Sequence, residues 1–136
     1  MLNAAEIVSE AEQQVGIPDP EPFVQRNLER LVEAINHESF MSAEGMASAH
    51  TALVNDVVNR LEGLRWLQRY PEIADEAIEK PVFLMGLPRS GTTYFQYLFD
   101  CDQRFRLIRT WEAMTPSPPP GFDPESAEQR RVTWAE

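Results

Sequence analysis

Basic residues, cysteine and histidine are all scarce in this chain of 136 residues. Its 12 Lys and Arg stand against 22 Asp and Glu, which gives a formal net charge of −10. We therefore expect neither a nucleic-acid partner nor binding to an anionic membrane surface. Cys101 is the single cysteine, so an internal disulfide and a cysteine-rich metal site are excluded. His37 and His50 stand apart from each other, and we expect no metal site.

Long apolar runs are also missing. No stretch approaches the ~20 apolar residues that a membrane span needs. The first residues, "MLNAAEIVSEAEQQ", have neither the basic start nor the apolar centre of a signal peptide. A chain with a single cysteine fits a reducing compartment best. We therefore expect a cytoplasmic protein without a membrane partner.

The first 80 residues have the pattern of helices. Apolar residues recur at helical spacing up to Gly16, again from Pro22 onwards, and in a longer run that starts after Ser42 and ends at Tyr70. The pattern predicts a helical N-terminal region over residues 1–80. His50 lies on the apolar side of the third run, and we expect it to pack there and not to take part in catalysis.

At residue 81 the pattern changes. Residues 81–86, "PVFLMG", are a short apolar run between a proline and a glycine, which is typical of a buried parallel strand. The apolar and aromatic residues over 94–99 suit a helix that packs on a sheet. We therefore predict an α/β fold, in which residues 81–136 form the first βαβ part of a P-loop-type parallel sheet. In such a strand, loop and helix, backbone N–H groups face an anion.

The loop itself differs from the usual nucleoside-triphosphate loop. Gly86 and Gly91 have the separation of the two glycines in GxxxxGK followed by Ser or Thr. Thr92 occupies the lysine position, however, so the cation that would reach the β- and γ-phosphates is absent. This disfavours an ordinary ATPase or kinase. The cation of this loop is Arg89, two residues before the second glycine.

The hexapeptide "PRSGTT", residues 88–93, resembles the phosphosulfate loop of the sulfotransferases that use 3′-phosphoadenosine 5′-phosphosulfate (PAPS). The form with arginine looks most like tyrosylprotein sulfotransferases and bacterial sulfotransferases with a helical N-terminal extension. Downstream, "RFRLIRTWEAM" is similar to the bacterial group. The resemblance covers residues 81–115 firmly and the helical region loosely. The alternative is a plain turn, in which the glycines relieve crowding and the threonines cap a helix.

The resemblance implies a role for each residue of the loop. The amides of Ser90, Gly91, Thr92 and Thr93, with the threonine hydroxyls, would hold the 5′-phosphate of PAPS. Arg89 would contact the sulfuryl group or the bridging oxygen, where negative charge develops as the S–O bond breaks. A sulfuryl group carries less charge than a phosphoryl group, so in-line transfer to a hydroxyl or amine acceptor is expected to need no metal.

The resemblance also suggests a general base. In tyrosylprotein and heparan-type sulfotransferases, a glutamate a little over twenty residues past the loop cation serves as base. Glu112 lies 23 residues after Arg89, just beyond a second short strand expected over residues 105–109. The alternative is a solvated loop glutamate. Three nearby arginines either face the donor or acceptor or, as is more usual, are solvated: Arg104, Arg106 and Arg109.

Family members bind the 3′-phosphate of PAPS with elements well beyond the loop. We therefore expect this chain to be the N-terminal portion of a sulfotransferase, inactive alone and prone to self-association, with an amphipathic helix beginning at residues 125–136. Two alternatives remain open. One is an atypical P-loop nucleotide-binding enzyme. The other is a non-catalytic helical interaction module with a vestigial loop.

Overall fold

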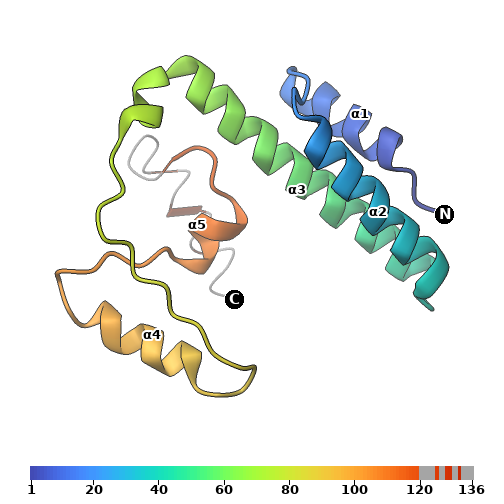
Figure 1. The fold of residues 1–136 in the computed structure, drawn as a ribbon. Helices are drawn as coiled ribbons and strands as arrows, with labels where there is room; N and C mark the ends of the chain where they lie inside the picture. Colours follow the sequence, from blue (N-terminus) through green and yellow to red (C-terminus); the bar gives the residue numbers. More distant parts are fainter. Residues whose placement is uncertain (120–124, 126–127, 130–131, 133–136) are drawn as a thin grey trace. The chain divides into compact units, whose positions relative to one another are not determined.

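The computed structural model of this protein describes residues 1–119, 125, 128, 129 and 132. The chain divides into a first unit, Met1–Pro71, and a second unit, Glu72–Glu136 (Figure 1). Every regular element within the described residues is helical: α1 (Ala4–Val15), α2 (Pro22–Glu38), α3 (Ala43–Arg69), a short 3-10 helix η1 (Pro71–Asp75), α4 (Thr92–Asp100) and α5 (Thr110–Met114). None of the described helices is long and apolar enough to cross a membrane.

The first unit has a hydrophobic core between its three helices. Helix α1 packs against both α2 and α3 (Figure 1). These helices follow the pattern expected over residues 1–80, of which residues 76–80 have irregular backbone. Ile7 of α1 and Leu61 of α3 are fully buried, and burial of each such side chain stabilises the fold by about 1.5–3 kcal/mol. Their buried neighbours are Leu2, Ala11, Val15, Leu28, Val32, Leu53, Val54 and Val57. His50 lies at the edge, 33% exposed and 3.8 Å from Glu10.

Local signals set the ends of these helices. The Asn3 side chain accepts a hydrogen bond from the Ala5 amide and so caps α1, which ends at Gly16 with a left-handed φ of 84°. The Ser42 hydroxyl oxygen accepts from the Gly45 amide and caps α3. Helix α3 ends at Tyr70 because the residue before a proline disfavours helical backbone.

The connection between α1 and α2 is fixed to α3 by a buried carboxylate. Asp19 lies in this connection, and its side chain is 2% exposed. One carboxylate oxygen accepts from Arg60 Nε on α3 at 2.8 Å, and the other accepts from the Glu21 amide at 2.9 Å. Burial alone would raise the pKa of Asp19. The hydrogen bonds from Arg60 and Glu21 and the charge of Arg60 outweigh burial, so the pKa is lowered.

The predicted α/β fold is wrong for the part of the chain that the structure describes. That part contains no strand and no sheet, and both predicted strands, residues 81–86 and 105–109, have irregular backbone. The physical reason is pairing. A strand is stable only beside a partner strand, and within the described residues neither segment has one. The apolar side chains of the first segment are exposed instead, 80% for Phe83 and 91% for Met85.

The helix predicted after the loop is confirmed as α4. Two of its aromatic side chains, Phe95 and Phe99, form an edge-to-face pair with ring centroids 5.2 Å apart. Phe99 forms a second such pair, at 4.9 Å, with Phe105, which follows the helix. No described residue of the second unit is buried; Phe95 is exposed, and Phe99 and Phe105 are half-buried. Most of the helix expected at residues 125–136 lies outside the described residues.

Candidate functional site

The loop before α4 is a tight turn with left-handed backbone at two positions. Both the amide and the hydroxyl of Ser90 donate to the Leu87 carbonyl, at 3.2 and 2.6 Å. Arg89 has a φ of 66° and Gly91 a φ of 88°. Glycine adopts this conformation without strain, whereas a residue with a side chain is disfavoured there. Arg89 is therefore held in a conformation that its own side chain disfavours.

The two glycines of the loop meet different requirements. A Cβ atom on Gly86 would lie 2.6 Å from Thr92 Cγ2 and 2.8 Å from Ser90 Oγ, distances that real Cβ atoms do not show. Gly86 thus allows the chain to pass close to the start of the helix. Gly91 has open space around its Cα, and its left-handed φ is what favours glycine there. Gly86 therefore marks the point where the chain passes close to the start of α4, and Gly91 marks the left-handed turn into the helix.

Gly91 is the N-cap of α4 and has no side chain that could cap the helix. Its carbonyl accepts from the Phe95 amide, which starts the helical pattern. The first amides of the helix, those of Thr92 and Thr93, have no side-chain cap and stand at the positive end of the helix dipole. This end of α4 is suited to an anion, with two threonine hydroxyls beside it.

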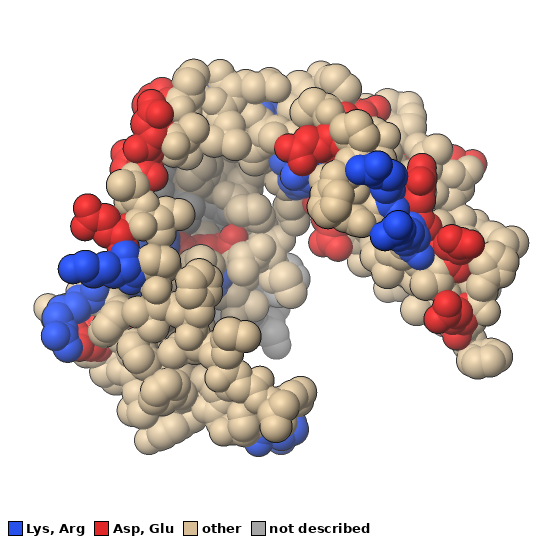
Figure 2. Space-filling model, viewed as in Figure 1, with Lys and Arg blue, Asp and Glu red and all other residues tan. Residues whose placement is uncertain are grey.

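Arg89 makes no ion pair with any residue that the structure describes. The other arginines of the described second unit are paired through their guanidinium groups, at 2.6 to 2.7 Å: Arg104 with Asp102, Arg106 with Glu112, and Arg109 with Asp100. These three side chains are exposed to solvent, in line with the more usual of the two alternatives given for them above. Each is also paired with an acidic side chain. On the face drawn in Figure 2, basic atoms at the loop before α4 lie among uncharged side chains.

Glu112 is covered, contrary to the solvated alternative. Its side chain is 10% exposed, and it lies in the first turn of α5 and not after a strand. One carboxylate oxygen accepts from Arg106 at 2.6 Å, and the other accepts from the backbone amide of Arg109 at 2.7 Å. Within the described residues, no hydrogen bond or ion pair joins Glu112 to residues 88–93.

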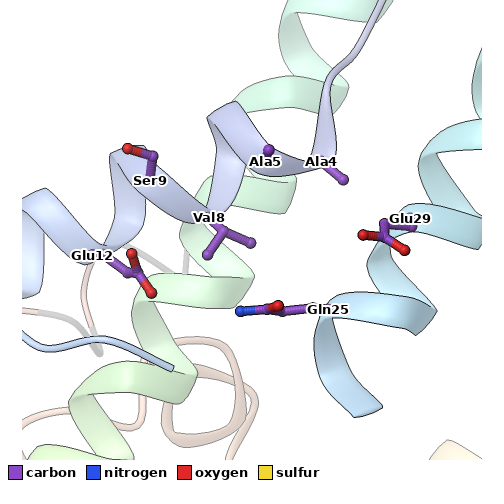
Figure 3. A pocket seen from close by; sticks show the side chains of 7 residues that line it. All are labelled: Ala4, Ala5, Val8, Ser9, Glu12, Gln25 and Glu29. Carbon is purple, nitrogen blue, oxygen red and sulfur yellow. The ribbon is translucent and has the colours of Figure 1, made fainter. Parts of the chain in front are cut away.

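The first unit offers a different kind of hollow. A pocket of about 200 Å³ lies between α1 and α2, and Figure 3 shows Gln25 and Glu29 extending from α2 toward α1. Glu12 lines the same pocket, so it holds two carboxylates and no basic side chain. Such a pocket repels phosphate and sulfate. No group of His, Cys, Asp and Glu in the described part of the chain is arranged to hold a metal ion.

Comparisons with protein-family models, with curated proteins and with solved structures found no match to this chain. The similarity to sulfotransferases therefore rests on the residues of the loop and its flanks. Sequence reasoning missed the partners of Glu112 and the pairing of Arg109 with Asp100. The Arg109 amide lies three residues before Glu112, the spacing of a capping box, which could have been recognised. The pairs of Arg106 with Glu112 and of Arg109 with Asp100, six and nine residues apart, do not have the spacing of neighbours on a helix, so no helical pattern marks them.

Proposed function

We propose that this protein takes part in transfer of a sulfuryl group from PAPS to a hydroxyl or amine acceptor. The observation that carries the proposal is the conformation of Arg89. It is a strained residue without an ion-pair partner among the described residues, and it comes just before an uncapped helix N-terminus. Strained backbone persists where the surrounding structure or a function requires it. An anionic ligand would supply the missing partner.

The proposed reaction follows from the charges of the loop. The amides of Gly91, Thr92 and Thr93 and the threonine hydroxyls bind the 5′-phosphate, and Arg89 contacts the bridging oxygen. The Ser90 amide, expected to bind the phosphate as well, donates to the Leu87 carbonyl and holds the turn instead. The acceptor oxygen or nitrogen attacks sulfur, and the S–O bond to the phosphate breaks. The leaving product is 3′-phosphoadenosine 5′-phosphate (PAP), and the acceptor proton passes to a base, for which Glu112 is the candidate.

Calorimetric binding of PAP to the full-length protein tests the proposal. We expect PAP to bind, and Arg89→Ala to weaken transfer more than binding, since the backbone amides remain. Arg104→Ala is the matched control, because it removes the same charge from a neighbouring turn. Equal effects of the two substitutions on transfer would remove Arg89 from the mechanism. Tight binding of Mg·ATP in place of PAP would favour the atypical nucleotide-binding enzyme.

A second candidate is the helical interaction module. It is favoured by the location of the core, because every buried residue in the described part of the chain belongs to the first unit. In that case the protein would bind neither PAP nor Mg·ATP. Arg89→Ala would then leave its properties unchanged, because alanine keeps the Cβ atom and so does not relieve the backbone strain.

A further inference from the structure

A continuous set of side chains connects the end of the loop helix to Glu112. Asp100 is the last residue of α4, and both its carboxylate oxygens accept from the Arg109 guanidinium, at 2.7 and 2.9 Å. Arg109 is also the N-cap of α5, and its backbone amide donates to Glu112. Arg106 donates to the other oxygen of the same carboxylate. We propose that Arg106 and Arg109 are positioning residues that orient Glu112 for proton abstraction, with Asp100 linking Arg109 to the loop helix.

The position of Asp100 supports this proposal. A carboxylate at the C-terminal end of a helix is opposed by the negative end of the helix dipole. The two hydrogen bonds from Arg109 offset that repulsion and fix the guanidinium in one plane. Helix α4 begins at the loop, so a group tied to its last residue is tied to the same rigid element that carries the proposed donor site.

The arrangement leaves Glu112 able to take a proton. A carboxylate has about four lone-pair positions, and the described contacts of Glu112 occupy one on each oxygen. The two donors restrict the rotation of the Glu112 side chain, but they do not occupy all the lone-pair positions of its carboxylate. Its remaining lone pairs are therefore oriented, which is what proton transfer in a fixed geometry requires. This role rests on the proposed sulfuryl transfer.

The test compares variants of the full-length protein in two assays, transfer of labelled sulfuryl from PAPS to a panel of phenols, alcohols and amines, and calorimetric binding of PAP. Glu112→Gln should lower kcat by about 100-fold or more. Arg109→Gln should lower kcat about tenfold and leave PAP affinity within about twofold, because it acts through Glu112 and not on the donor. Arg104→Gln removes an equivalent charge outside this set, and we expect it to leave both quantities unchanged.

Two further variants separate positioning from a purely structural role. The double variant Glu112→Gln with Arg109→Gln should be no slower than Glu112→Gln alone, because the group that Arg109 orients is already absent. Arg106→Lys retains a donor to Glu112 and should keep kcat within about threefold, whereas Arg106→Gln should lose about tenfold. Circular dichroism of each variant checks that the helical content is intact.

The outcomes distinguish this inference from the proposed function. An unaltered full-length protein that neither binds PAP nor transfers sulfuryl would overturn both. A protein that transfers sulfuryl, but in which Arg109→Gln behaves like Arg104→Gln, would overturn the positioning role alone. Additive losses in the double variant would also overturn it, since Arg109 would then act independently of Glu112.

Discussion

Replacing Asp19 by asparagine removes one charge from the best-buried ion pair in the described part of the chain. The amide has nearly the same shape as the carboxylate, and its oxygen can still accept from the Glu21 amide. What it loses is the charged partner of Arg60, which donates from Nε at 2.8 Å and from Nη2 at 3.4 Å. The substitution therefore tests the charge and not the packing.

The expected loss of stability is about 2 kcal/mol. Hydrogen bonds between charged groups contribute about 1.5–3 kcal/mol, and the 30% exposure of Arg60 lets water replace part of what is lost. For a domain of 60–100 residues, each kcal/mol lowers Tm by about 4–8 °C. The first unit ends at Pro71, so we expect a decrease of about 8–16 °C for Asp19→Asn.

Thermal unfolding followed by circular dichroism, at a series of pH values, measures this effect. Because the pKa of Asp19 is lowered in the folded state, its stabilisation is fully present above the unfolded pKa of about 3.9. It is lost as the pH falls through the folded pKa. The difference in Tm between the unaltered protein and Asp19→Asn should therefore be constant near neutral pH and shrink below about pH 4.

Glu21→Gln is the control, because Glu21 also contacts Arg60, at 3.2 Å, but its side chain is 58% exposed. An exposed pair contributes about 0–1 kcal/mol, so the control should lower Tm by only a few degrees. Equal effects of the two substitutions would refute the argument from burial. A difference between the unaltered protein and Asp19→Asn that persists unchanged at low pH would refute the argument from charge.

Three further predictions follow from packing and exposure. Gly86→Ala should abolish or strongly weaken PAP binding in calorimetry, because the new Cβ atom would lie 2.6 Å from Thr92 Cγ2. Gly63→Ala is the control and should leave PAP binding intact, because nothing lies within 4 Å of a Cβ atom there. Leu61→Ala should destabilise the first unit by about 2–5 kcal/mol in urea unfolding, and a loss below about 1 kcal/mol would contradict its complete burial. Light scattering should show self-association that decreases in a Phe83→Ser, Met85→Ser variant, and a monomeric unaltered protein would contradict this prediction.

The helices of the first unit could be predicted because their apolar residues repeat with the period of a helix and their ends carry local signals. Gly16 and Ser42 are examples of residues whose type alone marks a boundary. The contact between Asp19 and Arg60 could not be predicted, since it joins residues 41 positions apart and depends on how α1 and α2 pack on α3. Sequence periodicity describes one element at a time and carries no record of such contacts.

The strand predictions were wrong for a related reason. A run of six residues such as "PVFLMG" satisfies the pattern of a buried strand, but the pattern describes only one side of a pair. The conformation of the loop before α4 follows more directly from its residue types than the strands did. Gly86 and Gly91 take up the close approach and the left-handed turn locally, without distant partners. The pairs of Arg106 with Glu112 and of Arg109 with Asp100 again depend on a turn that brings residues 100 to 112 together, for which the sequence has no periodic signal.

The left-handed backbone of Arg89 has a consequence for how this position should vary in evolution. Glycine would remove a conformational cost of about 1–2 kcal/mol, so mutation to glycine would be favoured wherever the cation has no use. Under the proposed function, selection for charge would therefore oppose selection for stability at residue 89, while at Gly91 stability alone is enough to retain glycine. In lineages that keep the reaction, we expect arginine or lysine at this position. In lineages that have lost it, glycine or asparagine should accumulate there first, before the rest of the loop diverges.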